Sequence, residues 1–200
     1  MTRVQVRPTA KTRKRRRRRR TITLLIYIVV VFGLAWYFES QGTTTILFVR
    51  HADVDQSTQQ SQDQSLNATG LARAELLAEF LGQVDVVAGV DAIYVSPLKQ
   101  TQQTAAPIAK GLGLEIEVAD PYDVVGFMKN MLVEHKREIV LVVTHSDIIA
   151  PLVAELHGSK NIAEIAADDY DQLFIVTIPW WGKVKTLQLR YGVGWEPPQS

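Results

Sequence analysis

The stretch TILFVRHAD, residues 45–53, decides the fold. Its first part, Thr45–Arg50, is a continuous run of apolar and β-branched residues, which predicts a strand buried on both faces. The run IVLVVT at 139–144 predicts a second strand of the same kind. Strands without polar alternation are typical of parallel sheets covered by helices on both sides. These two runs therefore predict an α/β domain.

Around these two strands, the pattern alternates between strands and helices. Further strands are expected at 91–96, 114–118, 173–179 and 184–191, and helices at 69–81, 100–112, 124–135 and 148–156. Helical crossovers between apolar strands indicate a three-layer α/β/α sandwich with a mostly parallel central sheet. Such sheets place their chemistry at the carboxyl ends of the strands.

The charge of the chain is divided very unevenly along its 200 residues. Residues 1–42 hold 11 of the 22 Lys and Arg and one acid, Glu39, whereas residues 43–200 hold 11 basic and 20 acidic groups. The net charge of +1 therefore hides an acidic domain, which excludes a basic nucleic-acid-binding globule. The chain has no cysteine, which excludes disulfides, a thiol nucleophile and a Cys-ligated zinc site.

An uncharged apolar segment, Thr21–Phe38, separates the two charge blocks. As a helix it would be about 27 Å long, close to the thickness of the bilayer core, about 30 Å. The basic run Arg13–Arg20 precedes it, which predicts a cytoplasmic N-terminus and an extracytoplasmic domain, in a bacterial cell membrane. A cleaved signal peptide is disfavoured because bulky residues, Trp36 to Phe38, stand where cleavage requires small ones.

The predicted organisation therefore has four parts. A basic cytoplasmic tail covers residues 1–20, a transmembrane helix that serves as signal-anchor covers 21–38, a stem covers 39–44 and the α/β domain covers 45–200. Trp180, Trp181 and Trp195 lie in or after the expected terminal hairpin, where packing or a membrane-proximal surface is favoured over a ligand cage.

Polar clusters follow three of the predicted strands. Arg50-His51 follows the first, Ser96-Pro97 the second, and His145-Ser146-Asp147 the IVLVV strand. The two histidines can converge because parallel strands end at one edge of the sheet. A neutral imidazole is a competent nucleophile toward phosphorus, and an arginine fork matches phosphate oxygens. A second histidine can donate to those oxygens as negative charge develops.

Four motifs in this order resemble the histidine phosphatase superfamily, also called phosphoglycerate mutase-like. They are FVRHAD at 48–53, LNATGLARAELLAEFL at 66–81, SPLKQTQQTA at 96–105 and LVVTHSD at 141–147. The resemblance covers about residues 45–190 and implies a phosphoglycerate mutase-like fold. Each motif alone is weak, and the specificity comes from their order and their places at strand and helix boundaries.

The resemblance implies a two-step phosphatase reaction that needs no cofactor and no metal. His51 would take the phosphoryl group as a phosphohistidine, and water would hydrolyse it. Arg50 and His145 would bind the phosphoryl oxygens, with Ser96, Gln100 and Ser146 as further substrate-binding residues. A mutase is less expected, because only about 40 residues separate Ser96 from His145 and leave little room for a lid.

Two departures from the family pattern bear on activity. Gln100 stands where the family has a phosphate-binding arginine, so one charge-assisted hydrogen bond, about 1.5–3 kcal/mol if fully formed, is lost. Lys99 points elsewhere on the helix and compensates only in part. The acid that protonates the leaving group is not fixed by a motif. Asp123 is the preferred candidate, with Asp120 and Asp53 as alternatives.

Other functions remain possible on this sequence. A catalytically weakened phosphate pocket would bind a phosphorylated or anionic partner, and Gln100 motivates that alternative. A metal-dependent site would use the ligand-like spacing of His51, Asp53 and Asp55 and of His145 and Asp147, but the cationic Arg50 disfavours a dication beside it. The expected partner is a phosphorylated small molecule or a phosphoprotein, with no nucleic acid.

Overall fold

The computed structural model describes residues 10–39, 42–54, 63–83, 89–192 and 194–196. The chain divides into two compact units, Met1–Gly42 and Thr43–Ser200. Parts of the predicted tail (1–9), of the stem (40–41) and of the first motif's loop, with Asp55, lie outside the described residues.

In the first unit the structure describes one helix, α1, which runs from Ala10 to Glu39. Its stretch Arg16–Tyr37 is long and apolar enough to cross a membrane, by length and composition alone, and none of it is buried in protein. The hydroxyls of Thr21 and Thr23 donate to backbone carbonyls four residues earlier in the helix. Satisfied backbone and hydroxyl groups are what a helix in lipid requires.

The second unit is built on a six-stranded sheet in the order β3-β2-β4-β1-β5-β6. Strands β1 to β4 are parallel, β5 runs antiparallel to its neighbours β1 and β6, and the sheet is therefore mostly parallel as predicted. In chain order the elements are β1 (Thr44–Arg50), α2 (Ala68–Gln83), β2 (Ala92–Val95), α3 (Lys99–Leu112), β3 (Ile116–Val118), α4 (Val124–Glu134), β4 (Ile139–Thr144), α5 (Ser146–Glu155), β5 (Gln172–Ile178) and β6 (Lys185–Arg190).

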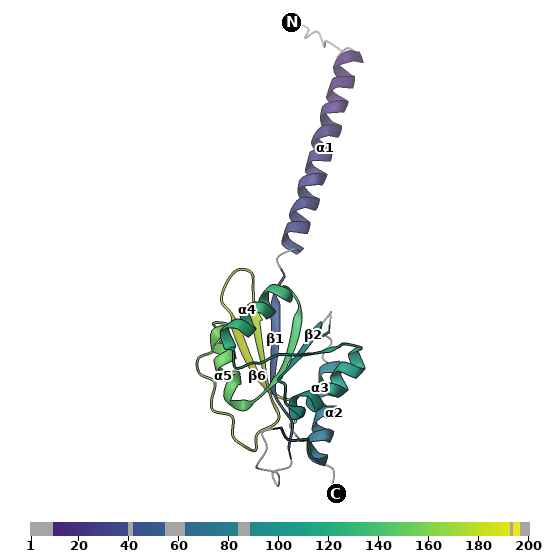
Figure 1. Cartoon of the computed structure of the whole chain (residues 1–200). Helices are drawn as coiled ribbons and strands as arrows, with labels where there is room; N and C mark the ends of the chain where they lie inside the picture. Colours follow the sequence, from purple (N-terminus) through teal and green to yellow (C-terminus); the bar gives the residue numbers. More distant parts are fainter. Residues whose placement is uncertain (1–9, 40–41, 55–62, 84–88, 193, 197–200) are drawn as a thin grey trace. The chain divides into compact units, whose positions relative to one another are not determined.

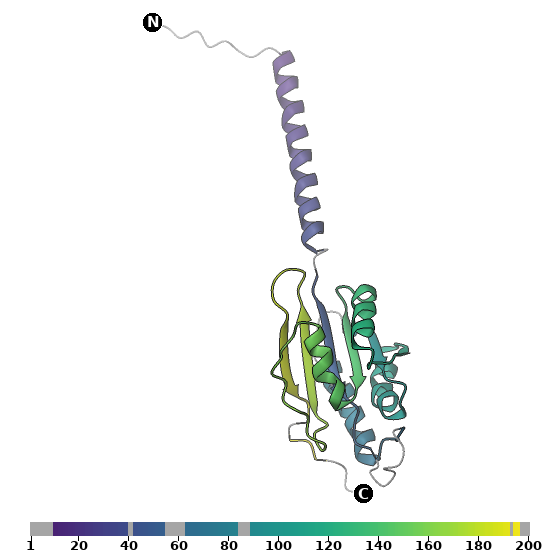
Figure 2. The same ribbon diagram turned by 60° about the vertical axis from the view of Figure 1, so that its left-hand side comes forward.

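Helices cover both faces of this sheet, as Figures 1 and 2 show. Alternate residues of β1 enter two separate cores. Ile46 and Phe48 pack against α4 and α5, whereas Leu47 and Val49 pack against α2 and α3. The central strands are therefore apolar at every position, which is why the sequence shows no alternation there. The predicted three-layer sandwich is confirmed.

The predicted strands and helices of the α/β domain all occur, with ends that move by one or two residues, whereas the segment 21–38 is part of a longer helix, Ala10–Glu39. The helix α2 begins one residue before the expected range 69–81, and Asn67 caps it. Because the helix begins at Ala68, the Asn67 side-chain oxygen accepts from the backbone N–H of Gly70 at 2.8 Å.

Candidate active site

Two histidines meet at the carboxyl edge of the two central strands. His51 follows β1 and His145 follows β4, and the register pairs Arg50 with Thr144 immediately before them. The His51 backbone N–H donates to the Thr144 carbonyl at 2.9 Å, which ties the two strand ends together. The ring centroids of His51 and His145 are 5.4 Å apart, and both residues are only 8% exposed. The predicted convergence therefore occurs.

A backbone carbonyl fixes the tautomer of His51. Its Nδ1 lies 2.8 Å from the Ala52 carbonyl oxygen, which can only accept, so Nδ1 carries the proton. The neutral ring then has its lone pair on Nε2, the atom that can attack an electrophile. Ala52 itself is held by its N–H, which donates to Thr104 Oγ1 at 2.9 Å.

Burial keeps both rings neutral. Desolvation lowers the pKa of His51 to about 4, and the positive charge of Arg50 adds to this effect. Desolvation also lowers the pKa of His145, although the nearby Asp147 carboxylate opposes the shift. At neutral pH, His51 is therefore an unprotonated nucleophile rather than an imidazolium.

Arg50 is positioned by a segment far along the chain. Its Nη1 donates to the carbonyls of Ala166 at 2.9 Å and Asp169 at 3.2 Å, and its guanidinium carbon lies 4.1 Å from the centre of the Tyr170 ring. Asp169 in turn pairs with Arg190 at 2.7 Å. The acidic segment before β5 therefore holds Arg50, the candidate phosphate-binding residue, in position.

Two buried polar atoms at this edge lack a protein partner. Arg50 Nε and Thr144 Oγ1 are the buried side-chain nitrogen and oxygen atoms without a hydrogen bond among the described residues. Buried donors are ordinarily satisfied, because leaving one unpaired costs about 1–3 kcal/mol. Their positions on the last residues of β1 and β4 suit an oxyanion held between the strand ends.

Ser96 and Thr101 hold the second histidine. Ser96 Oγ lies 2.9 Å from His145 Nε2 and 2.9 Å from Thr101 Oγ1, and the Thr101 hydroxyl reaches the Leu98 carbonyl at 2.8 Å. Ser96, which was predicted to bind substrate, therefore also orients the His145 ring through this hydrogen bond. Ser96 is 2% exposed.

The second and third motifs contain residues that build the loop after His51. Leu66 N–H donates to Gln103 Oε1 at 2.8 Å, and Asn67 N–H donates to the Asp53 carbonyl at 3.1 Å. A Cβ on Gly70 would lie 2.0 Å from that same carbonyl oxygen, so only glycine allows α2 to approach so closely. These motif positions therefore maintain the geometry of the loop.

Gln100 is placed at the start of α3 with its side chain buried, 4% exposed. Its Oε1 accepts from the backbone N–H of Gln64 at 3.1 Å. Its neighbour Lys99 is exposed and pairs with Asp63 at 3.3 Å. The charge of Lys99 is therefore directed to Asp63, and the glutamine amide occupies the position of the family arginine.

The predicted acids have different surroundings. Asp53 forms an ion pair with Arg73 at 2.5 Å, which holds its carboxylate. Asp123 is exposed and caps α4, accepting from the Gly126 N–H at 3.2 Å. Asp120 accepts from the N–H of Tyr122 at 3.0 Å.

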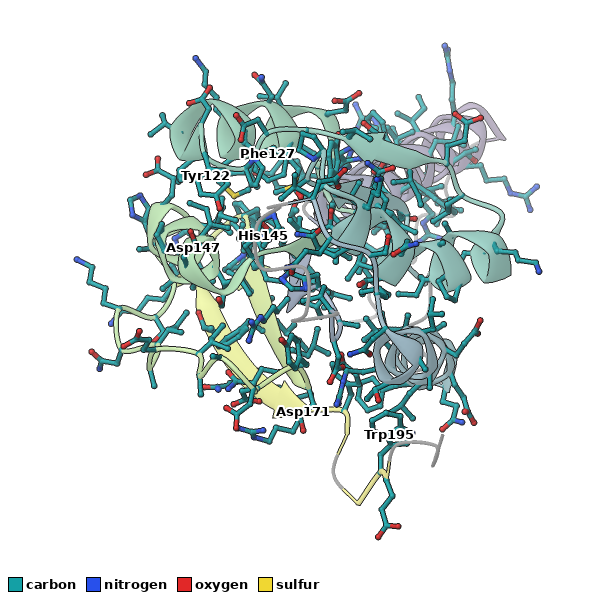
Figure 3. All side chains as sticks on the ribbon, turned by 60° about the horizontal axis from the view of Figure 1, so that its bottom comes forward. Tyr122, Phe127, His145, Asp147, Asp171 and Trp195 are labelled. Atoms are coloured by element: carbon teal, nitrogen blue, oxygen red, sulfur yellow. The ribbon has the colours of Figure 1, made fainter. Side chains whose placement is uncertain are left out.

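Sequence reasoning missed Tyr122, which belongs to the same loop as Asp123. Its ring is stacked on that of His145, with centroids 6.3 Å apart and an interplanar angle of 18°, and its hydroxyl donates to Asp147 at 3.2 Å. Figure 3 shows Tyr122 and Asp147 beside His145. The sequence signal for Tyr122 was its position next to the candidate acid Asp123. The contact of Tyr170 with Arg50 was also missed, and its sequence signal was limited to its place in an acidic segment.

A pocket of about 400 Å³ adjoins this edge. Ser146, the last predicted binding residue, begins α5 and lines the pocket together with Asp147, Ala150 and the segment 162–165. Ala166, which follows that segment, holds Arg50. The pocket is therefore next to the residues that would bind the phosphoryl group.

A cluster with metal-ligand geometry also exists, but elsewhere. Among the described residues, Glu117, Glu134 and His135 bring ligand atoms within 4.8 Å of one another. That cluster includes neither His51 nor His145.

Comparison with known proteins supports the assignment of the domain. The family model of the histidine phosphatase superfamily (branch 1) matches residues 46–121. A phosphohistidine phosphatase SixA homolog of Haemophilus influenzae is 25% identical over 130 residues, covering 58% of this chain and 79% of that protein.

Solved structures share the fold. The protein histidine phosphatase SixA complexed with tungstate superposes with a TM-score of 0.60 at 22% identity, over 74% of this chain and 97% of that one. A mycobacterial glucosyl-3-phosphoglycerate phosphatase superposes with a TM-score of 0.55 at 15% identity, over 74% and 98%. The matched segment begins at β1 and includes the first three motifs, and the fourth lies on the neighbouring β4. The domain is therefore similar to the histidine phosphatase superfamily in the sequence of residues 46–121, and it shares the fold of solved histidine phosphatases.

Proposed function

We propose that this chain is a membrane-anchored phosphatase that hydrolyses phosphomonoesters through a phosphohistidine formed on His51. The observation that carries the proposal is the hydrogen bond between His51 Nδ1 and the Ala52 carbonyl, which leaves Nε2 with the lone pair. Burial and the adjacent Arg50 keep this ring unprotonated. The similarity to the histidine phosphatase superfamily supports a histidine-type phosphatase.

In the first step, His51 Nε2 forms a bond to phosphorus while the bond from phosphorus to the leaving oxygen breaks. The Arg50 guanidinium and His145 donate to the phosphoryl oxygens and stabilise the charge spread over them. In the second step, a water oxygen attacks the phosphohistidine, and the N–P bond breaks. The products are inorganic phosphate and regenerated neutral His51.

The departing oxygen needs a proton in the first step. We assign it to Asp123, because this residue directly follows Tyr122, whose ring lies on His145. The pocket lined by Ser146 and Asp147 would then receive the leaving group. The same carboxylate can take a proton from the attacking water in the second step.

The substrate is proposed to be a phosphorylated small molecule or a phosphoprotein. The name of the Haemophilus influenzae relative, a phosphohistidine phosphatase homolog, makes a phosphohistidine protein one substrate to assay. The helix α1 and the basic run before it favour an anchored protein with a cytoplasmic N-terminus and an extracytoplasmic domain.

Trapping the intermediate tests the proposal directly. The detergent-solubilised full chain is mixed with a radiolabelled phosphomonoester and quenched in alkali, where phosphohistidine survives and acyl phosphates do not. We expect label on the native chain and none on the His51→Ala variant, whose turnover also falls to background. Equal labelling and turnover of the two proteins would overturn the proposal.

A second candidate function rests on Gln100. The buried glutamine supplies no charge where the family has arginine, which favours a phosphate pocket that binds a phosphorylated or anionic partner with little turnover. The Gln100→Arg variant separates the two functions. If the native chain has low turnover and Gln100→Arg raises that turnover at least about tenfold, which corresponds to one charge-assisted hydrogen bond, the result supports the binding module. High native turnover that the substitution leaves unchanged or lowers supports the enzyme.

A further inference from the structure

Two adjacent tryptophans are exposed at the end of the sheet opposite the active site. Trp180 and Trp181 are 55% and 81% exposed in the turn that joins β5 to β6. The chain reverses there at Gly182, whose φ of 115° lies in the region that favours glycine. Neighbouring exposed indoles in a folded domain require an explanation, because burying such rings is strongly favourable.

The register of the sheet places this turn beside the entry of the chain into the domain. Ile178, the last residue of β5, pairs with Thr44, the first residue of β1. Thr44 Oγ1 also accepts from the backbone N–H of Arg137 at 2.8 Å. The tryptophan turn and the loop before β4 therefore share one edge of the sheet with the start of β1.

The chain length before β1 limits how far this edge can be from a membrane. Four residues join Glu39, the end of α1, to Thr44. Such a segment reaches at most about 18 Å when fully extended. Once α1 spans a bilayer, the start of β1 stays within that reach of its surface for every arrangement of the two units.

Charge also differs between the two edges of the sheet. The turn and the loops beside it carry the cations Lys136, Arg137, Lys160, Lys183 and Lys185 together with the acids Asp91, Glu115, Glu134, Glu138 and Glu155. The loops at the edge of the active site carry more acids, Asp53, Asp63, Asp120, Asp123, Asp147, Asp168, Asp169 and Asp171, than cations, Arg50, Arg73, Lys99 and Arg190. An anionic lipid surface therefore repels the edge of the active site more strongly than the tryptophan edge, where Lys183 and Lys185 lie close to the indoles.

We propose that the β5–β6 turn, with Trp180, Trp181 and Lys183, is a lipid-docking surface that seats the domain on the bilayer in which α1 is anchored. The inference rests on the proposed membrane anchor. Indole rings occupy the headgroup region because their apolar body and polar N–H suit it, and lysines beside them meet lipid phosphates. Docking in this way turns His51 and His145 toward the aqueous phase and holds the substrate pocket open to soluble substrates.

The absence of cysteine makes a clean test possible. Single cysteines replace Lys183 at the proposed docking turn or, as matched control, the exposed Lys99 at the opposite edge. Each is labelled with an environment-sensitive fluorophore, and the full chain is reconstituted in phosphatidylcholine–phosphatidylglycerol vesicles. Headgroup nitroxide lipids in both leaflets serve as quenchers. We expect the label at 183 to lose most of its fluorescence and the label at 99 to lose little.

A second set of variants ties the result to the tryptophans. Replacing Trp180 and Trp181 with serine should restore the fluorescence at 183, whereas the matched double change Leu71→Ser and Val125→Ser, at exposed apolar positions elsewhere, should not. Equal quenching at both labels, or quenching that survives loss of both tryptophans, overturns the docking proposal. A chain that does not float with the vesicles overturns the anchor and the docking with it, while a phosphatase assay of the same sample reports separately on the catalytic proposal.

Discussion

The domain contains two buried histidine sites, and they differ in how their hydrogen bonds are completed. At the active-site edge, within the described part of the chain, His51 and His145 each have one hydrogen-bonded ring nitrogen, and the neighbouring Arg50 Nε has no protein partner. On the α4 side of the sheet, both nitrogens of His135 are engaged. Its Nδ1 lies 2.7 Å from Glu138 and its Nε2 lies 2.9 Å from the Tyr94 hydroxyl.

The contrast shows what separates a structural histidine from a functional one. The His135 ring links α4, β2 and the start of β4 in a closed network, and every partner is a protein group. The His51 site instead combines a fixed tautomer, a nearby cation and unpaired donors, which is a costly arrangement unless an anion completes it. The following predictions test this difference, beginning with the largest expected effect.

The matched pair His145→Ala and His135→Ala should separate activity from stability. We expect His145→Ala to lower kcat/KM by roughly 10²–10³-fold, because one donor to the developing negative charge is removed. His135→Ala should leave kcat/KM within about threefold of native, because its ring does not contact the site. Steady-state rates with p-nitrophenyl phosphate provide the measurement, and equal losses in the two variants would contradict the distinction.

Unfolding of the same two variants should show the reverse order. His135→Ala removes a buried ring and leaves the Tyr94 hydroxyl without its 2.9 Å partner, so we expect a loss of about 2–3 kcal/mol in the free energy of unfolding. His145→Ala should cost less than about half of that, because its ring holds one hydrogen bond and its burial disfavours a charged form. Urea titrations followed by tryptophan fluorescence measure both, and a larger loss for His145→Ala would argue against a site built for a ligand.

The same residues show what the sequence could and could not predict. Strand-end placement of Arg50, His51 and His145 follows from apolar runs and motif order, because parallel strands must end at one edge. The support of Arg50 by Tyr170 was not predictable, because it depends on how a loop 120 residues later folds back across the sheet. The contact of His135 with Tyr94 was not predictable for the same reason, because the sequence shows only a helix end and Tyr94 lies on another element.

The fold itself was predictable because its evidence is local. Wholly apolar strands, helical spacing and glycines at helix ends each depend on a few neighbouring residues. The proton-donating acid was harder, because several exposed aspartates share the same loops. Only tertiary contacts distinguish Asp53, which pairs with Arg73, from Asp123, which caps α4 beside Tyr122.

The pH dependence of stability should report the buried, neutral His51. Its pKa is about 4 in the folded chain and about 6.5 when unfolded, so the unfolded state binds more protons between these values. Protonation of this residue alone should therefore lower the free energy of unfolding by about 2 kcal/mol between the plateau above pH 6.5 and pH 5. The His51→Ala variant should lose less over the same interval. A His51 ring that titrates near 6.5 by NMR would contradict this account.

The smallest effect should distinguish two carboxylates near His145. If Asp123 protonates the leaving group, Asp123→Asn should slow hydrolysis of phenyl phosphate, a poor leaving group, by roughly tenfold or more, and p-nitrophenyl phosphate far less. Asp147→Asn removes the carboxylate that raises the pKa of His145, so it should affect both substrates alike. The informative quantity is therefore the rate with phenyl phosphate divided by the rate with p-nitrophenyl phosphate, because a general loss of folding or of phosphate binding leaves this ratio unchanged. If Asp123→Asn leaves this ratio unchanged and Asp147→Asn lowers it, the proton donor is Asp147, which accepts a hydrogen bond from the Tyr122 hydroxyl, and not Asp123.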